Sequence, residues 1–485
     1  MDYKHVLDHT KPAQKYFEEI SRIPHNSNEE KAISDYIVTF AKAHGLWCHQ
    51  DELWNVIVKK PASPGYEDAP SVMLQGHMDM VCVKTEESTH DFAKDPLELY
   101  VENCILHARG TSLGADDGVG VAYMLAVLED DSIKHPALEC VFTVQEETGM
   151  YGAKGIDGTL LSARRMIGLD AAGETSSFVA CYCSDRIEIV KALTFEEVRG
   201  QICAFKISGL ETINPGECVH QEAGNGIKMM GRLLYRLLSE GIAINLCGLE
   251  GGIAENHNPR ECIASFVCDK ALMEKAKTIL QQELQLLDNE FDKAGHPARL
   301  DFTEVPDVKG MLPAKASEEI INLIYLLPNN VFQWSFHLKE MMSVNNIGLI
   351  SLDEEKLYIL MSTRSRVESS AIQLQKHCEA LASVYADTVV VTSRYRPWAY
   401  NPDSYMRKLT NRILQQKWGK QLEEMVCCGG LEMAVFADKL PGLDVVMIGP
   451  IYMDMHKTSE WLDLESFDRV YEILLLILEE LKEME

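Results

Sequence analysis

Short apolar runs alternate with longer amphipathic stretches in the first third of the chain. Four runs have the length and the Val, Ile, Leu and Met content of buried strands: residues 54–60, 71–77, 139–147 and 165–170. Residues 119–130 (VGVAYMLAVLED) predict a helix between the second and third runs. A helix over residues 31–45 is expected after the capping-box pattern Ser27-Asn28-Glu29-Glu30. This alternation predicts an α/β sheet, a class in which functional residues lie at strand ends.

The pattern changes after about residue 195, where strands cluster between longer helices. Residues 224–241 predict one of these helices, and the expected strands are residues 201–210, 264–269, 330–336, 345–352 and 356–366. This grouping is typical of an α+β domain.

From about Tyr395 the first pattern returns. The expected elements are helices at 403–417 and 431–438, a strand at 444–450 and an amphipathic C-terminal helix that packs on the core. We therefore expect an α/β domain of residues 1–195 and 393–485, interrupted by an α+β domain of residues 196–392.

Length and charge narrow the function classes. The chain has 485 residues, too many for one compact core, and its net charge is −28. So negative a charge disfavours broad surfaces for nucleic acid or anionic membranes. The charged N-terminal stretch lacks the pattern of a secretory signal, and no apolar run approaches the ~18 residues of a membrane span. We expect a cytoplasmic protein with reduced cysteines and with neither nucleic acid nor membrane as partner.

The stretch 108–120 (ARGTSLGADDGVG) contains two candidate chemistries. Its G-x-S-x-G pattern around Ser112 matches a nucleophile elbow, in which the serine lies directly between a strand and a helix. Here the expected helix begins only near Gly118, after the carboxylates of Asp116 and Asp117, which would oppose an oxyanion. The serine interpretation is therefore disfavoured, which leaves a metal site or an ordinary glycine-rich turn.

Other potential metal ligands stand at strand ends. His77 and Asp79 are two residues apart on a strand, so both side chains share one face, where an aspartate orients a ligating imidazole. Glu146 and Glu147 end another strand and point to opposite sides unless the chain turns. That arrangement lets one bind metal while the other faces a reacting water. Each motif alone also fits a solvated charge pair or a core histidine.

The order of these motifs along the chain is more specific than any one of them. H-x-D, G-A-D-D-G, E-E-T-G, a strand-terminal Asp and a distant histidine after G-P together resemble the di-zinc metallopeptidases that include glutamate carboxypeptidases, aminoacylases and dipeptidases. The segments LQGHMDMVC, HDFAKDPLELY and GGLEMAVF are similar to those of aminoacyl-histidine dipeptidases, also called β-alanyl-histidine or Xaa-His dipeptidases. This resemblance spans nearly the whole chain. It implies a zinc-aminopeptidase-like catalytic domain with an inserted α+β lid domain that binds substrate.

The resemblance also implies a set of metal ligands. Asp116 would bridge two divalent ions, with Zn²⁺ expected first and Mn²⁺ or Co²⁺ as alternatives. His77 and Asp170 would hold one ion, and Glu147 and His456 the other.

Catalytic roles follow from the same matching. Glu146 would take a proton from the water between the metals and pass it to the leaving amine. Asp79 would orient His77. The family pattern also implies a cis peptide bond between Asp116 and Asp117.

Four residues match substrate-binding positions of the family. Arg364 in LMSTRSR would bind the free carboxylate of the substrate, and Asn256 in GGIAENHNP matches a family asparagine. Gly430 and Glu432 in GGLEM match a loop near the same carboxylate. A surface ion pair is the ordinary alternative for Arg364.

The chain departs from the family pattern at two positions. Asn214 stands where the family has a histidine that helps to hold the oxyanion, and His220 is a substitute donor six residues later. Cys428 stands where dipeptidase relatives tend to carry histidine. Both changes concern the substrate pocket, so they leave di-metal hydrolysis expected and put histidine specificity in question.

We therefore expect a dipeptidase that hydrolyses short peptides, of the Xaa-His or β-alanyl-His type or broader, through a metal-bridging water. An N-acyl-amino-acid deacylase of the same superfamily is the alternative. An inactive binding homologue is disfavoured, because it has no physical need to keep the whole ligand set and Glu146. The resemblance leaves a homodimer open.

Overall fold

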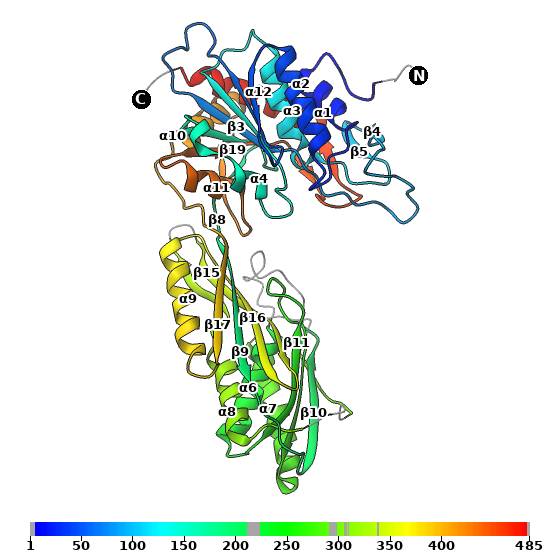
Figure 1. Ribbon diagram of the computed structural model, residues 1–485, viewed down its shortest axis with the longest axis vertical. Coiled ribbons are helices and arrows are strands. Elements are labelled where there is room, and N and C mark those ends of the chain that lie inside the picture. The colour runs from blue at the N-terminus through cyan, green and yellow to red at the C-terminus, as the bar shows by residue number, and fades with distance from the viewer. Residues whose placement is uncertain are drawn as a thin grey trace. The chain divides into compact units, whose positions relative to one another are not determined.

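The computed structural model describes residues 5–210, 224–290, 298–304, 308, 310–336 and 339–482 (Figure 1). The chain forms two compact units. Unit 1 consists of Met1–Cys181, Trp398–Cys427 and Leu431–Glu485, and unit 2 of Tyr182–Pro397 and Cys428–Gly430. The predicted α/β class with an inserted α+β part is confirmed.

The first segment of unit 1 ends at Cys181, 14 residues before the predicted boundary at 195, and its second segment begins at Trp398, 5 residues after the predicted start at 393. Strand β9 (Ser184–Ala192) pairs along its length with β16 (Lys356–Ser365) and with β17 (Thr388–Tyr395), so it belongs to the sheet of unit 2. The boundary of a unit depends on which distant segments pair as strands. The local pattern of hydrophobic residues contains no information about that pairing.

A six-stranded sheet forms the centre of unit 1. Its strands, in spatial order, are β1 (Trp47–Gln50), β2 (Val56–Lys60), β6 (Leu138–Thr143), β3 (Val72–His77), β7 (Arg165–Gly168) and β19 (Asp444–Met447). Strands β6, β3, β7 and β19 are parallel, and β1 and β2 add an antiparallel edge. The carboxyl ends of the four parallel strands therefore meet at one edge of the sheet, where α/β proteins bind ligands.

Helices cover both faces of this sheet, which explains the nearly continuous apolar runs of its strands. Alternate residues of β3 face opposite layers: Val72 and Leu74 join one core, and Met73 joins the other. The first layer contains α1 (Pro12–Ile20), α2 (Lys31–Ala43), α3 (Ala115–Glu129), α10 (Tyr405–Trp418) and α12 (Leu464–Glu480). The second contains α4 (Tyr151–Gly155) and α11 (Glu432–Lys439).

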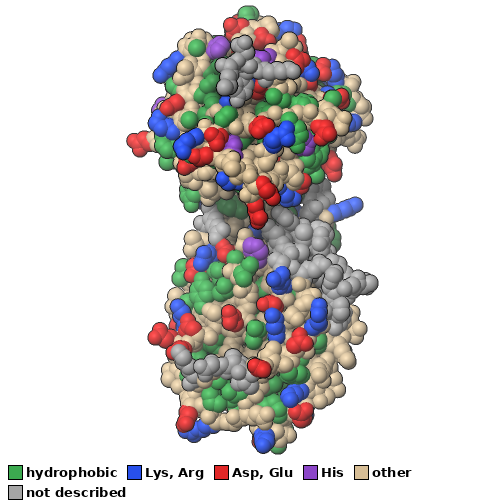
Figure 2. All heavy atoms as spheres, turned by 90° about the vertical axis from the view of Figure 1, so that its right-hand side faces the viewer, with side chains coloured by type: hydrophobic (Ala, Val, Ile, Leu, Met, Phe, Trp, Pro, Cys, Tyr) green, Lys and Arg blue, Asp and Glu red, His purple; other side chains and the backbone are tan. Residues whose placement is uncertain are grey.

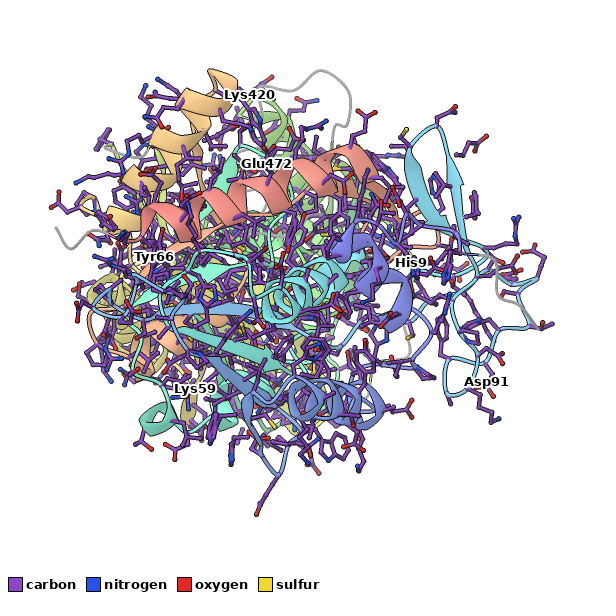
Figure 3. The ribbon with its side chains drawn as sticks, turned by 90° about the horizontal axis from the view of Figure 1, so that it is seen from above. His9, Lys59, Tyr66, Asp91, Lys420 and Glu472 are labelled. Atoms are coloured by element: carbon purple, nitrogen blue, oxygen red, sulfur yellow. The ribbon has the colours of Figure 1, made fainter. Side chains whose placement is uncertain are left out.

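The C-terminal helix is part of the core, as expected. In Figure 3, where Glu472 is labelled, α12 crosses unit 1 beside α3, and the Tyr123 hydroxyl of α3 donates to the Phe467 carbonyl at 2.7 Å. In the described part of the chain, no helix combines the length and apolarity needed to cross a membrane.

Smaller elements complete unit 1. A four-stranded sheet has the order β20 (Tyr452–Met453), β21 (Trp461–Asp463), β5 (Ile105–Ala108) and β4 (Leu99–Glu102), and β18 (Glu423–Cys427) pairs in parallel with β8 (Ser176–Cys181). A short 3-10 helix spans Gly158–Leu160. The small sheet is important for the site because β5 leads into α3 and a loop joins β20 to β21.

Unit 2 contains a nine-stranded antiparallel sheet. The spatial order is β13 (Arg299–Phe302), β10 (Gln201–Ser208), β12 (Cys262–Cys268), β11 (Asn245–Gly252), β15 (Glu340–Leu352), β16, β9 and β17, and β14 (Asn330–Ser335) pairs with β15. Its apolar core lies between the sheet and the helices α6 (Gly226–Ser239), α7 (Met273–Glu290), α8 (Ala314–Leu326) and α9 (Glu368–Ala382), beside a 3-10 helix at Lys270–Leu272. Acidic and basic side chains are interspersed over the face shown in Figure 2.

Candidate metal centre

The predicted metal ligands lie at one edge of the main sheet of unit 1. His77 is the last residue of β3, and Asp170 and Glu147 follow the ends of β7 and β6. Asp116 lies at the start of α3, and His456 lies in the loop between β20 and β21. Parallel strand order thus gathers side chains that are far apart in sequence.

These five side chains form two groups that share Asp116. The potential ligand atoms of His77, Asp116 and Asp170 all lie within 4.8 Å of one another, and so do those of Asp116, Glu147 and His456. His77 Nε2 is 3.0 Å from Asp116 Oδ1, whereas His456 Nε2 is 2.7 Å from Glu147 Oε1 and 3.4 Å from Asp116 Oδ2. The two oxygens of Asp116 therefore face different histidines, one in each group.

The electrostatics of the five groups fit a pair of cations. Burial and the negative charge of Asp116 raise the pKa of Asp170 to about 7. Burial opposes ionisation of Asp116, but hydrogen bonds from His456 and His77 hold its pKa well below the ordinary value. Hydrogen bonds to Asp116 and Glu147 raise the pKa of His456 to about 10. Protons on Asp170 and His456 thus balance the negative charge that a divalent ion would otherwise balance. Imidazole and carboxylate groups are ligands that suit Zn²⁺, Mn²⁺ or Co²⁺.

The ring of His77 is oriented for ligation. Its Nδ1 lies 3.0 Å from the main-chain carbonyl of Asp79, which only accepts, so Nδ1 carries the proton and Nε2 faces Asp116. The Asp79 carboxylate is 3.5 Å from Nδ1. The main chain of Asp79 therefore makes the closer contact with this ring.

The Asp79 carboxylate also holds the turn after β6, a role that the sequence did not indicate. It accepts hydrogen bonds from the main-chain N–H of Glu146 at 3.1 Å and of Glu147 at 3.3 Å, and from the Ser27 hydroxyl at 2.8 Å. Asp79 therefore ties the end of β3 to the turn that carries both glutamates.

The predicted capping box is wrong, and its residues support this turn instead. Helix α2 begins after Glu30 with no side-chain cap. The Glu30 carboxylate accepts from the N–H of Asn28 at 2.9 Å and of Gln145 at 3.0 Å, and Ser27 bonds to Asp79. The spacing of Ser27 and Glu30 resembles a capping box because a capping box and the observed turn both use a serine and a glutamate as hydrogen-bonding groups.

Glu146 stands beside the ligands. Its carboxyl lies within 4.8 Å of the ligand atoms of His77 and Glu147. Burial raises its pKa well above the ordinary value, with the charge of His77 opposing that shift and Asp170 adding to it. A carboxyl group so perturbed is suited to accept and return a proton near neutral pH.

The peptide bond between Asp116 and Asp117 is cis, as the resemblance implies. The buried Asp117 carboxylate accepts from the main-chain N–H of His77 at 3.1 Å and of Gly120 at 3.1 Å. Asp117 thus connects α3 to the end of β3, a role that the sequence pattern did not assign.

Glu432 lies inside unit 1, with 2% of its surface exposed. Its Oε2 accepts from Thr143 Oγ1 at 2.6 Å and from Gln75 Nε2 at 2.5 Å, and Thr143 is the register partner of His77. Burial raises its pKa to about 8. Glu432 is therefore a buried carboxyl group bonded to the strands that carry the site.

The other substrate-binding candidates belong to unit 2. Arg364 on β16 donates from Nη1 to the carbonyl of Cys428 at 2.8 Å, which places it next to the stretch that includes Gly430. Asn256 is exposed in the loop after β11, with its Oδ1 3.0 Å from His257 Nδ1. Asn214 and His220 lie outside the described residues.

Ser112 has a structural role. Its side chain is buried, its hydroxyl donates to the Val81 carbonyl at 2.7 Å, and it accepts from the Val83 N–H at 3.2 Å. The hydroxyl holds two loops together and is not presented as a nucleophile.

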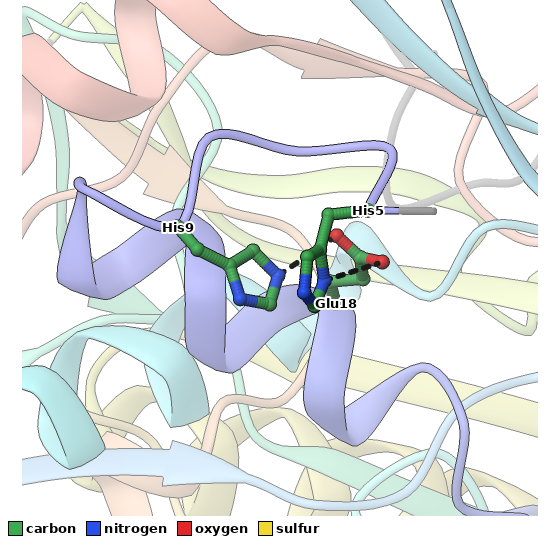
Figure 4. Close-up of side chains that lie close together, drawn as sticks. All are labelled: His5, His9 and Glu18. Carbon is green, nitrogen blue, oxygen red and sulfur yellow. Dashed lines mark hydrogen bonds and ion pairs between the residues drawn. The ribbon is translucent and has the colours of Figure 1, made fainter. Parts of the chain in front are cut away.

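A separate cluster, His5, His9 and Glu18, lies at the start of the chain (Figure 4). His9 Nε2 is 3.0 Å and His5 Nδ1 3.7 Å from the Glu18 carboxylate. The same carboxylate already accepts from the N–H of Leu7 at 3.0 Å and from Arg22 at 2.6 Å. We interpret this cluster as an ion-pair network that fastens the N-terminal segment to α1.

Comparison with known proteins agrees with this geometry. Residues 73–480 match the family described as Peptidase family M20/M25/M40. The cytosol non-specific dipeptidase of Escherichia coli (strain K12) is 30% identical over 473 residues, which cover 97% of each chain.

Solved structures extend the comparison. The aminoacylhistidine dipeptidase of Vibrio alginolyticus superimposes with a TM-score of 0.93 at 27% identity, over 99% of this chain and 98% of that one. The aminopeptidase PepT of Bacillus cereus, at 16% identity and a TM-score of 0.57 over 99% of this chain and 100% of that one, shares the fold. With a family match over residues 73–480 and a relative that is 30% identical over 97% of the chain, the chain belongs to the M20/M25/M40 peptidase family.

Proposed function

We propose that the protein is a metal-dependent dipeptidase that hydrolyses short peptides with a free C-terminal carboxylate. One observation carries this proposal: five potential ligands form two groups around Asp116, and the carboxyl of Glu146 stands beside them. Xaa-His and β-alanyl-His dipeptides are the first substrates to test, and broader specificity fits the replacement of family histidines by Asn214 and Cys428.

The relatives support a dipeptide as substrate. Two relatives that match nearly the whole chain, at 30% and 27% identity, are named as a cytosol non-specific dipeptidase and an aminoacylhistidine dipeptidase. The first of these names also supports a cytoplasmic location for this protein.

The proposed cofactor is a pair of divalent ions, Zn²⁺ first. Asp116 would be shared, His77 and Asp170 would hold one ion, and Glu147 and His456 the other. When bound, such ions polarise a carbonyl group and lower the pKa of water.

Glu146 moves the proton in the proposed reaction. It accepts a proton from the water whose oxygen attacks the scissile carbonyl carbon. It then delivers that proton to the amine nitrogen as the C–N bond breaks, so the products are a carboxylic acid and an amine. The hydrogen bond from the Glu146 main chain to Asp79 fixes where this carboxyl stands.

We assign substrate binding to unit 2, as a lid domain. Arg364 is the proposed partner of the substrate carboxylate, because its Nε is buried and has no hydrogen-bond partner among the described residues. A guanidinium group with spare donors binds carboxylates in a two-pronged geometry. Asn256 is a second candidate contact.

A substrate panel tests the reaction class. Xaa-His and β-alanyl dipeptides, ordinary dipeptides and N-acetyl amino acids are each assayed with added Zn²⁺ or Mn²⁺. We expect turnover of dipeptides. Turnover of the N-acetyl amino acids alone would establish a deacylase and overturn the proposal.

Glu146→Gln tests the proton-transfer role. We expect kcat to fall by about 10²–10⁴-fold while the bound metal per chain stays at the wild-type level. The exposed Glu423→Gln on β18 is the matched control and should keep full activity. If Glu146→Gln turned over dipeptides at the wild-type rate, the assignment of the base would be wrong.

A further inference from the structure

A buried glutamate in the loop between β20 and β21 binds the start of α3. Glu460 has 3% of its surface exposed. Four consecutive main-chain N–H groups donate to its carboxylate: Leu113 at 2.7 Å and Gly114 at 3.0 Å to Oε2, and Ala115 at 2.9 Å and Asp116 at 3.4 Å to Oε1. One side chain thus satisfies the whole turn that leads to Asp116.

These N–H groups need a partner from elsewhere in the fold. The first N–H groups of a helix have no acceptor within the helix, and the cap residue Gly114 offers no side chain. The backbone at Asp116 and Asp117 is not helical, so the opening turn of α3 is irregular. A buried N–H left unpaired loses its hydrogen bond to water and gains none in return, which destabilises the folded state.

Sheet pairing brings Glu460 to this turn. Trp461, the first residue of β21, pairs with His107 of β5, and β5 continues into the turn before α3. The loop that ends at Glu460 is itself ordered, because the Asp454 carboxylate accepts from Lys457 Nζ and from Ser459 Oγ, both at 3.0 Å.

The same loop carries His456, four residues before Glu460. Glu460 therefore joins the two segments that present the ligands His456 and Asp116, whose Nε2 and Oδ2 atoms are 3.4 Å apart. Without the hydrogen bonds of Glu460, both ligands would remain present, but the distance between His456 and Asp116 would vary. A metal site requires that distance to be held within a few tenths of an ångström.

We propose that Glu460 is a positioning residue of the metal centre, acting through the backbone of Asp116 and through the loop of His456. Its carboxylate accepts from main-chain N–H groups, so its proposed effect on the metal centre is indirect. The inference rests on the proposed two-metal site, and its test measures metal binding directly.

The test is Glu460→Gln, which keeps the shape but replaces one acceptor oxygen by an NH₂ group that faces N–H donors. Zn²⁺ affinity of the metal-free protein is measured by competition with a chromophoric chelator. We expect the affinity to fall by about 10–100-fold, the range found when groups that orient ligands are removed.

The matched control is Glu139→Gln at the far end of β6 from the site. Glu139 is also buried at 3% exposure, and its carboxylate accepts from the main-chain N–H of Ser162 and Ala163, both at 3.0 Å. We expect this variant to lose stability comparably and to bind Zn²⁺ as the wild type does. Glu460→Asp, which keeps the charge, serves if Glu460→Gln does not fold, and it should lose affinity to a smaller extent.

The inference is overturned if the Glu460 variant that folds binds Zn²⁺ like the wild type, or if the Glu139 control loses as much affinity. Wild-type protein that binds two ions without hydrolysing dipeptides would contradict the proposed substrate and leave the Glu460 result valid. Wild-type protein that binds no Zn²⁺ would contradict both proposals.

Discussion

Glu146 and Glu432 are both buried carboxyl groups of unit 1, but their surroundings differ. Glu146 stands among metal-ligand candidates, where an incoming cation changes its charge balance. Glu432 is bonded to Thr143 and Gln75, and its other oxygen has no partner among the described residues. We propose the first for proton transfer, whereas the second is a buried acid whose ionisation opposes folding.

Glu432 should therefore make stability depend on pH. Its pKa is raised by burial from 4.5 to about 8, so between these values the folded chain holds a proton that the unfolded chain has released. The free energy of unfolding then falls as pH rises through this window. Relative to wild type, metal-free Glu432→Gln should gain about 1–4 kcal/mol between pH 5 and pH 8.

Urea unfolding of both metal-free proteins at the two pH values measures this difference. If wild type and Glu432→Gln differed by the same free energy of unfolding at pH 5 and at pH 8, the prediction would be wrong. The exposed Glu423→Gln is the control and should track wild type at both pH values.

At the scale of elements, the site depends on how strand ends are tied together. The end of β3 carries His77 and Asp79, and Asp79 accepts the two N–H groups of the turn after β6. Without these bonds the turn has to find other acceptors, and the carboxyl groups of Glu146 and Glu147 move with it.

Asp79→Asn tests this tie. An amide has one acceptor oxygen where the carboxylate has two, so it cannot serve both turn N–H groups and the Ser27 hydroxyl. We expect both Zn²⁺ affinity and kcat to fall by about 10–100-fold, measured by chelator competition and steady-state hydrolysis. Ser27→Ala removes a single hydrogen-bond donor to Asp79, so Zn²⁺ affinity and kcat should both fall less than in Asp79→Asn. An Asp79→Asn enzyme with wild-type affinity and rate would contradict the role.

At the scale of the whole molecule, the two units have separate cores. All five ligand candidates belong to unit 1, whereas the apolar core of unit 2 is built from its own sheet and helices. A ligand that binds the folded state stabilises only the cooperative unit that holds it.

Metal removal should therefore act on unit 1 alone. A chelator is expected to abolish hydrolysis, and added Zn²⁺ or Mn²⁺ should restore it. In calorimetry the chelator should lower the Tm of the transition of unit 1 and leave the Tm of a second transition unchanged. The loss is about 4 kcal/mol for each ion present at a thousand times its Kd. Equal shifts of both transitions would show that the units unfold together and would contradict the prediction.

The sequence by itself determined the element types, the α/β class and the candidate ligands. Apolar runs buried on both faces predict parallel strands, and His77, Asp116, Glu147, Asp170 and His456 stand at their ends or in nearby turns. The strands and helices depend on residues close together in the chain, so a local pattern carries them. The ligand set depended on the order of motifs along the whole chain and on the family resemblance that this order supports.

The tertiary structure decided which segments meet. Glu460 and Asp116 are 344 residues apart, and only the pairing of β21 with β5 brings them together. Ser27 and Glu30 have the spacing of a helix cap, yet hydrogen bonds to Asp79 and Gln145 assign them to the site. A buried polar group takes whichever partner the fold supplies, and local spacing does not reveal a partner hundreds of residues away.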